Sequence, residues 1–272
     1  MYCNLNIFHS THFHCIGRFL QPERPPRLDK MMKPLLVAFD FDHTIINDNT
    51  DLIVQKLLPA DKITDDLKKL YKEDGWTAFM QKIFILLHES GITPTQIRDA
   101  IVRIPATPGM NNLLRTLEQF QVEVIIISDS NSVFIKDWLT ESSLKNVVAQ
   151  VFTNPAHYDE DGCLKIEMYH LQNWCQFSTR NLCKGHILES YVEKRRNEGI
   201  DFSHLAFVGD GKYDLCPSLR LSENDLVFAR EDFHLDKLIK EMQNQKDESV
   251  KATVHSWKSG DDILKVVSDY FN

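Results

Sequence analysis

Short runs of apolar residues, each followed by polar residues, recur along the chain. Residues 34–39 read PLLVAF, and similar runs lie at 122–127 and 205–208. Because both faces of such a run are apolar, each predicts a buried strand of a parallel sheet. Two weaker runs, 226–228 and 252–254, predict further strands.

A helical period separates these runs. In residues 76–87, large apolar side chains recur at spacings of three and four, which is typical of an amphipathic helix. The same reasoning predicts helices within 51–105 and at 111–120, 133–141, 184–197 and 261–270. Residues 146–182 are less regular, and we expect short strands at 151–152 and 164–166 around the turn at 159–162.

Strands that alternate with helices predict an α/β fold with a doubly wound parallel (Rossmann-like) sheet. The helical stretch 51–105 interrupts the alternation directly after the first strand. We therefore predict a core domain of residues 33–50 and 106–272, with residues 51–105 inserted as a helical cap over the strand ends.

Residues 1–31 differ from the rest. Three prolines (Pro22, Pro25 and Pro26) disfavour helix and central strand, which predicts a disordered N-terminal extension. His9, His12, His14 and Cys15 lie close together, but their spacing matches no zinc pattern with a second ligand pair. A targeting role stays open because the segment is basic, although it lacks an amphipathic helix.

The composition limits the kinds of partner that the protein can bind. The 272 residues carry a formal net charge of −8, which argues against binding to nucleic acid or to an anionic membrane. No stretch approaches the roughly 18–20 uncharged apolar residues of a membrane span. The chain is long and shows no secretory signal, so its six cysteines predict reduced thiols in a cytoplasmic protein.

Two carboxylates, Asp40 and Asp42, follow the first predicted strand. Because like charges this close repel, they need a cation or a proton. One carboxylate can attack an electrophile while the other transfers protons. The alternative is a turn in which aspartates cap the next helix.

Polar residues also follow the other strands. The Ser128 hydroxyl can bind a phosphoryl oxygen or cap a helix. Lys184 opens a helix, where the helix dipole disfavours a cation, so we expect an anionic partner for it. The alternative is a solvated surface lysine. Asp210 and Asp214, four residues apart beside glycines, suit a hard cation or a Gly/Asp turn.

The order of these elements is more specific than any one of them. AFDFDHT, IISDS, Lys184 and GDGKYD resemble the four motifs of the haloacid dehalogenase superfamily of aspartate-nucleophile phosphohydrolases. The segments TPGM, VFTNP, NLCK and VGDGKYDLCP extend the resemblance, over about residues 33–270, to a eukaryotic subfamily. This subfamily contains pyridoxal phosphate phosphatase and phosphoethanolamine/phosphocholine phosphatase. SDSNSVFI resembles the pyridoxal phosphate branch more closely.

The resemblance implies a reaction in two steps. Asp40 is the expected nucleophile and forms an aspartyl-phosphate. Asp42 is the expected acid that protonates the leaving oxygen and then the base that activates water. Ser128 and Lys184 are expected to neutralise the phosphoryl oxygens, in keeping with a reaction that depends on positioning and charge stabilisation.

The resemblance also implies a Mg²⁺ cofactor. The expected ligands are the Asp40 carboxylate, the Asp42 backbone carbonyl and Asp210, with Asp214 supporting the metal or its waters.

Substrate choice depends on two more carboxylates. Asp51 and Asp129 match positions that the family uses near the substrate head group, where carboxylates can attract an ammonium or quaternary ammonium group or bond to a pyridoxal ring. The alternative roles are a helix cap for Asp51 and a solvated turn for Asp129. The expected substrate is a small phosphomonoester, with pyridoxal 5'-phosphate favoured and phosphoethanolamine or phosphocholine as the alternative. Trp76 and Phe79 belong to the cap core or stack on a substrate ring.

Two departures from the family pattern matter. Tyr213 stands where the family usually has Asn, which leaves open a catalytically weak protein that binds a phospholigand. The family also carries a stretch rich in His and Cys before the motif lysine, and here only His170, Cys175 and Cys183 remain as counterparts. We predict that the cysteines are reduced and pack in the core, and that there is no second metal site.

Overall fold

The computed structural model describes residues 34–73, 75–245 and 250–271. The predictions on residues 1–31 lie outside this part of the chain. So do Cys3 and Cys15, whereas the other four cysteines are free thiols.

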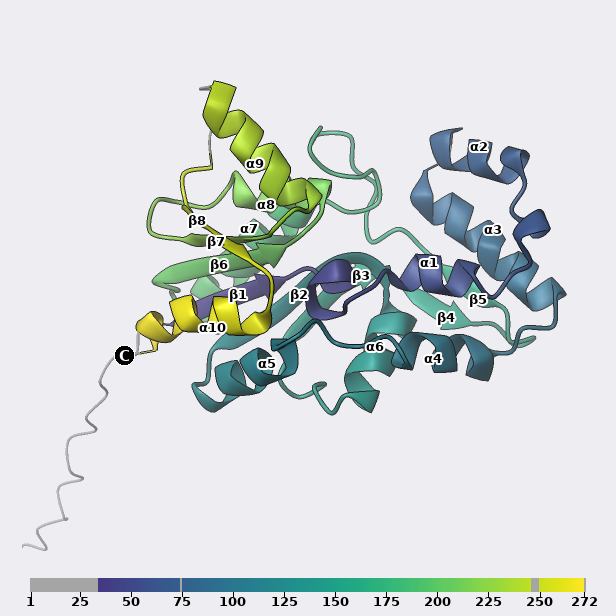
Figure 1. Cartoon of the computed structure of the whole chain (residues 1–272), viewed down its shortest axis with the longest axis horizontal. Coiled ribbons are helices and arrows are strands. Elements are labelled where there is room, and N and C mark those ends of the chain that lie inside the picture. The colour runs from purple at the N-terminus through teal and green to yellow at the C-terminus, as the bar shows by residue number, and fades with distance from the viewer. Residues whose placement is uncertain (1–33, 74, 246–249, 272) are drawn as a thin grey trace, which may run out of the picture. The chain divides into compact units, whose positions relative to one another are not determined.

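Six parallel strands form the central sheet, in the order β3-β2-β1-β6-β7-β8 (Figure 1). Its strands are β1 (Leu35–Phe39), β2 (Glu123–Asn131), β3 (Gln150–Asn154), β6 (His204–Gly209), β7 (Leu226–Arg230) and β8 (Thr253–Trp257). The predicted doubly wound parallel sheet is confirmed.

Helices cover both faces of this sheet (Figure 1). On one face lie α5 (Met110–Gln119), α6 (Ser132–Glu141) and α10 (Gly260–Val267); on the other lie α7 (Lys184–Asn197), α8 (Leu215–Ser218) and α9 (His234–Gln245). The central strand explains the arrangement. Val37 and Phe39 enter the first core, which lies between the sheet and α5, α6 and α10. Leu36 and Ala38 enter the second core, which lies between the sheet and α7, α8 and α9. Alternate side chains point to opposite faces, so an uninterrupted apolar run fits a sheet that is buried on both sides.

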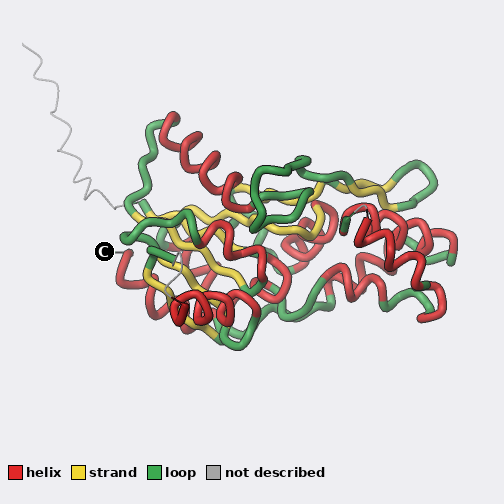
Figure 2. The backbone as a smooth tube through the Cα atoms, turned by 90° about the horizontal axis from the view of Figure 1, so that it is seen from above, coloured by secondary structure: helices red, strands yellow, loops and turns green. Residues whose placement is uncertain are grey.

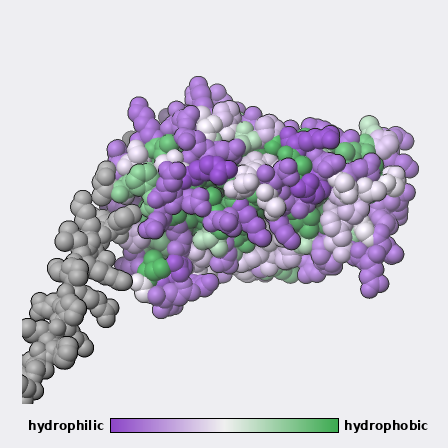
Figure 3. All heavy atoms as spheres, turned by 90° about the horizontal axis from the view of Figure 1, so that it is seen from below, coloured by the Kyte–Doolittle hydropathy of each residue, from purple (hydrophilic) through white to green (hydrophobic). Residues whose placement is uncertain are grey.

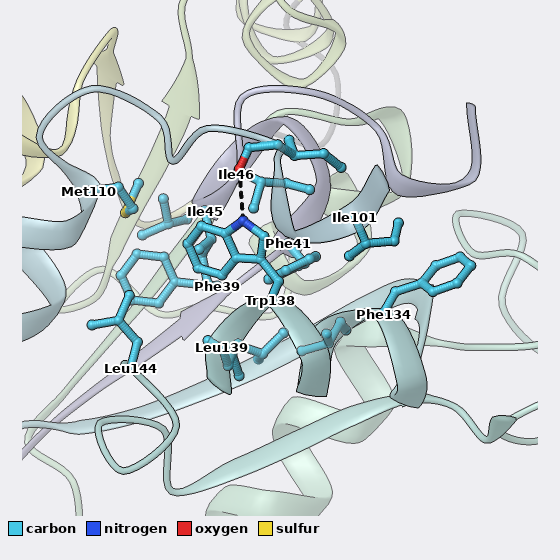
Figure 4. Close-up of a cluster of buried hydrophobic side chains, with 14 of the residues drawn as sticks. Phe39, Phe41, Ile45, Ile46, Ile101, Met110, Phe134, Trp138, Leu139 and Leu144 are labelled. Atoms are coloured by element: carbon cyan, nitrogen blue, oxygen red, sulfur yellow. Dashed lines mark hydrogen bonds between the residues drawn. The ribbon is translucent and has the colours of Figure 1, made fainter. Parts of the chain in front are cut away.

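The first core also anchors the turn that follows β1. Phe41 is fully buried and packs edge-on against Trp138 of α6, with ring centroids 5.7 Å apart (Figure 4). The Trp138 indole N–H donates to the Ile104 carbonyl at 2.9 Å. Since Phe41 separates Asp40 from Asp42, its burial fixes the turn that carries both carboxylates.

Four helices follow that turn, namely α1 (Thr50–Gln55), α2 (Asp65–Glu73), α3 (Trp76–Glu89) and α4 (Pro94–Val102). They gather beyond the carboxyl ends of the strands (Figure 1). A two-stranded hairpin of β4 (Ala156–Tyr158) and β5 (Leu164–Ile166) lies beside them (Figure 2). The division into a core and a cap of residues 51–105 stays a prediction.

Three elements differ from the expectation. Residues 151–152 belong to β3 of the main sheet. The strand that pairs with 164–166 is β4, and Gly162 in the turn between the two takes a φ of +83°. Strand β2 continues to Asn131, past the predicted end at 127, with an irregular register after Ser128. Helix α9 was not predicted, although Leu235 and Ile239 form its buried stripe.

Hydrophilic side chains dominate the face in Figure 3. Among the described residues, we find no helix that is long and apolar enough to cross a membrane.

Candidate active site

The site begins where two neighbouring strands end. Asp40 follows β1 and Asp210 follows β6, and the Asp40 N–H donates to the Val208 carbonyl of β6 at 2.9 Å. Later strands add on opposite sides of this pair, so β1 and β6 flank the point at which the strand order reverses. In open parallel sheets, such a switch point leaves a crevice at the carboxyl ends of the strands.

A cavity of about 160 Å³ lies at this position. It is lined by seven of the eight residues that the sequence singled out: Asp40, Asp42, Ser128, Asp129, Lys184, Asp210 and Asp214. Asp51 is not among the lining residues. Their placement is consistent with the predicted roles, which stay predictions.

Lys184 is the cation at the centre of the site. It is only 4% exposed, so the alternative of a solvated surface lysine is excluded. Its Nζ lies 2.9 Å from Asp40 Oδ1 and 2.6 Å from Asp214 Oδ1. Burial alone would lower the pKa of Lys184, but the two carboxylates outweigh this and raise the pKa above its ordinary range. The lysine therefore stays charged when buried.

Three carboxylates lie close together here, and two of them pair with Lys184. Ligand oxygens of Asp40, Asp210 and Asp214 all lie within 4.8 Å of one another. Burial, together with the neighbouring Asp40 and Asp214, raises the pKa of Asp210 well above its usual range. The Thr44 hydroxyl donates to Asp210 at 3.3 Å. Such an excess of buried negative charge suits a hard divalent cation.

Glycine permits this close packing of carboxylates. The Asp214 carboxylate accepts the backbone N–H groups of Asp210 (3.0 Å) and Gly211 (2.8 Å). A Cβ on Gly209 would lie 2.5 Å from Asp214 Oδ2, which no side chain tolerates. The motif glycine is therefore required for contact between the strand end and Asp214. Burial, partly offset by Lys184, raises the pKa of Asp214 to about 6.

Asp42 has a different environment from Asp40. Its two oxygens accept the backbone N–H and the hydroxyl of Thr50, the first residue of α1, each at 3.1 Å. The predicted alternative, an aspartate at a helix start, is thus part of its geometry. Burial, followed by the nearby charge of Asp51, raises the pKa of Asp42 well above its usual value. A carboxyl that keeps its proton at higher pH is suited to donate that proton.

Ser128 does not cap a helix. Asn131 caps α6, since its side chain accepts the N–H groups of Val133 and Phe134 at 3.1 Å. The buried Ser128 hydroxyl accepts the Ser130 N–H at 3.2 Å and borders the cavity. It keeps a proton to donate, which is what a phosphoryl oxygen needs.

A second cavity of about 460 Å³ adjoins the first, since Asp129 and Tyr213 line both. Asp129 is held by the side chains of Thr179 (3.2 Å) and Asn181 (2.8 Å). Neither was predicted as a site residue. Asn181 lies in the NLCK segment, so the motif contained a signal whose role only the contact reveals.

Asp51 lies behind the wall of the second cavity. One oxygen accepts the Trp76 indole N–H at 2.6 Å, and the other is buried without a hydrogen-bond partner. Burial raises the pKa of Asp51 to about 7, although the bond from Trp76 opposes the shift. Trp76 lines the cavity. Phe79 is buried and packs against Trp76, with the centroids of the two rings 5.3 Å apart.

We expect Asp51→Asn to stabilise the protein increasingly as the pH rises. A carboxyl whose folded pKa exceeds its unfolded value binds extra protons in the folded state. The contribution of Asp51 to the stability of wild type is therefore lost between the ordinary pKa of 3.8 and about 7, whereas the amide does not titrate. Urea unfolding across this interval should show a growing difference. A difference independent of pH would mean that Asp51 ionises normally.

The chain is similar in sequence to known phosphatases. The family described as "Putative Phosphatase" matches residues 35–270. The chain is 39% identical to the pyridoxal phosphate phosphatase PHOSPHO2 of Bos taurus, over 85% of this chain and 95% of that protein. It is 31% identical to the phosphoethanolamine/phosphocholine phosphatase of Homo sapiens, over 84% and 86% of the two chains.

Solved structures share the fold. A substrate-bound phosphoserine phosphatase superposes with a TM-score of 0.56 at 19% identity, covering 86% of this chain and 98% of the other.

Proposed function

Because the chain belongs to the Putative Phosphatase family, we propose that it is a phosphatase of the haloacid dehalogenase type and that it hydrolyses pyridoxal 5'-phosphate with the residues described above. The observation that carries the proposal is the pair of adjoining cavities. The smaller one holds the reactive carboxylates and Lys184, and the larger one has room for an aromatic ring.

In the first step, an Asp40 oxygen forms a bond to phosphorus while the bond to the leaving oxygen breaks. Asp42, whose raised pKa favours the protonated form, delivers its proton to that oxygen. Lys184 and Ser128 bind the phosphoryl oxygens and neutralise their charge. In the second step, Asp42 removes a proton from water, which attacks phosphorus and releases phosphate and free Asp40.

Asp40 and Asp210 are the proposed side-chain ligands of Mg²⁺, together with the Asp42 backbone carbonyl, and Asp214 supports them. The bound ion supplies positive charge that stabilises the phosphoryl oxygens. The donor set fits, because hard oxygen ligands are preferred by Mg²⁺ and three buried carboxylates face a single lysine.

We expect Mg²⁺ to raise the melting temperature of the full chain. Saturation at a hundredfold excess over Kd adds about 2.7 kcal/mol, which corresponds to a shift of roughly 5–11 °C. Differential scanning fluorimetry with and without EDTA measures it. Asp210→Asn should remove most of the shift, whereas Asp61→Asn, at an exposed carboxylate, should not. An equal shift in both variants would contradict the assignment.

The larger cavity favours pyridoxal phosphate over phosphocholine. Trp76 and Tyr213 offer aromatic walls, and Asp129 can accept a hydrogen bond from a ring substituent. Arg180 lines the same cavity. A guanidinium attracts a phenolate oxygen but repels a quaternary ammonium group, so its presence disfavours a choline head group.

The proposal is tested by phosphate release from pyridoxal phosphate, phosphoethanolamine, phosphocholine and phosphoserine under identical conditions. We expect the highest kcat/KM for pyridoxal phosphate, and Arg180→Ala should reduce that preference relative to phosphocholine. A higher kcat/KM for phosphocholine would favour the alternative substrate. Tight binding without turnover, restored by Tyr213→Asn, would favour a catalytically weak binding protein.

A further inference from the structure

Three cysteines from separate segments meet beside the active site. Cys175 lies in the loop between β5 and α7, Cys183 directly precedes α7, and Cys216 lies in α8. The Cys216 sulfur is 3.5 Å from that of Cys175 and 3.8 Å from that of Cys183. The Ser178 hydroxyl completes the group, at 3.5 Å from the Cys175 sulfur and 3.3 Å from the Cys183 sulfur.

These separations match the edges of a metal-centred tetrahedron. With Zn–S bonds of about 2.3 Å and a Zn–O bond of about 2.0 Å, a tetrahedral site has S–S edges near 3.8 Å and S–O edges near 3.5 Å. All three sulfurs lie within 4.8 Å of one another, and Cys183 and Cys216 are buried. The thiols are therefore prearranged, with little movement needed to surround an ion.

We propose that Cys175, Cys183 and Cys216 bind one zinc ion, with the Ser178 hydroxyl as the fourth ligand. The three thiols lose their protons to solvent when the ion binds. Three thiolates leave the site with one net negative charge. Arg220, which also forms an ion pair with Glu189, offsets part of this charge, because its Nη2 lies 3.9 Å from the Cys183 sulfur.

Close backbone approach also supports the cluster. A Cβ on Gly185 would lie 2.8 Å from the Cys216 sulfur and 2.4 Å from Arg220 Nε. The glycine thus allows the first turn of α7 to pack against both groups. The sequence predicted reduced packing cysteines and no second metal site here. Cys216 lies in a separate motif, so its contact with the other two cysteines could not be foreseen.

The loop that connects β5 to α7 (Figure 1) is the segment that the zinc site would stabilise. Residues 167–183, all of which are described, form no helix or regular strand, and Leu171, Trp174 and Phe177 are exposed instead of building a core. Loops of this length are uncommon in compact domains without other support. Four protein ligands indicate a structural site.

This site connects the loop to the catalytic residues. Thr179 and Asn181 of the loop hold Asp129, Cys183 is adjacent to Lys184, and Cys216 is two residues beyond Asp214. Zinc would therefore position one wall of the substrate cavity relative to the reactive carboxylates.

The test is the zinc content of the purified full chain, measured by mass spectrometry after incubation with zinc and removal of free ion. We expect one more equivalent in wild type than in Cys216→Ala. Zinc affinity should fall by more than about 100-fold, since even outer-shell changes cost about 10–100-fold. Cys163→Ala, at a buried cysteine outside the cluster, should keep the wild-type content. Any zinc on residues 1–31 cancels, because all variants share them.

Two further measurements keep the outcome decisive. Cobalt-loaded wild type should show thiolate charge-transfer absorption that Cys216→Ala lacks. Ser178→Cys, which offers a fourth thiolate, should bind zinc more tightly than wild type, a result that misfolding cannot produce. Equal zinc content in wild type and Cys216→Ala, or no gain in Ser178→Cys, would overturn the proposal. Neither measurement depends on turnover, so the zinc site and the proposed substrate succeed or fail separately.

Discussion

Replacing Asp40 with Asn should reduce turnover of any phosphomonoester by at least about 10⁴-fold, as expected when a nucleophile that acts within a catalytic unit is lost. An amide oxygen is a poor nucleophile and cannot form the aspartyl-phosphate. The fold should persist, because the change removes one of three carboxylates that repel each other around Lys184. Steady-state phosphate release, together with melting temperature, measures both effects.

Covalent labelling separates a lost nucleophile from a lost binding site. Acid-quenched wild type should carry a hydroxylamine-labile phosphate after brief exposure to labelled substrate, and Asp40→Asn should carry none. Asp48→Asn is the matched control, because Asp48 lies in the same segment but does not line the cavity. Wild-type turnover in Asp40→Asn would exclude Asp40 as the nucleophile.

Replacing Lys184 with Met should impair both stability and catalysis. The side chain is buried with Asp40 and Asp214, and removing one partner of a buried ion pair costs about 3–5 kcal/mol. Loss of the charge on the phosphoryl group should lower kcat by about 10²–10³-fold. Urea denaturation without divalent ions and steady-state kinetics with saturating Mg²⁺ measure the two effects.

A lysine on the same helix provides the control. Lys194 is 57% exposed and lies 3.9 Å from Glu198, so Lys194→Met should change stability by less than about 1 kcal/mol. Mg²⁺ should stabilise Lys184→Met more than wild type, since the carboxylates then lack their only close cation among the described residues. Equal stabilities of the two variants would mean that Lys184 is not paired in solution.

Much of the fold could be predicted because the required signals are local. The apolar run at 34–39 predicts β1 whatever it packs against, since alternate side chains must enter opposite cores. Helix α9 and hairpin strand β4 were missed. Leu235, Leu238, Ile239 and Met242 follow the helical period, so α9 was predictable, whereas β4 is too short for its period to be seen.

The candidate site divides in the same way. Asp40, Asp42 and Asp210 could be placed together because parallel strands end at one edge of the sheet. The sequence did not show that Asp51 lies behind Trp76 or that Thr179 and Asn181 hold Asp129. These contacts depend on how a loop and a helix pack, which no residue spacing specifies.

From the sequence alone, the strands β1 and β6 and the carboxylates Asp40 and Asp210 that follow them could be identified, because periodicity and motif order are properties of neighbouring residues. The tertiary structure decided which of them become buried and which meet. Lys184 could have been a surface lysine until its pairing with Asp214 was seen, and Cys216 joins Cys175 only because the loop before α7 packs against α8. Burial and contact between distant segments arise from the packing of whole elements, so they become visible only in three dimensions.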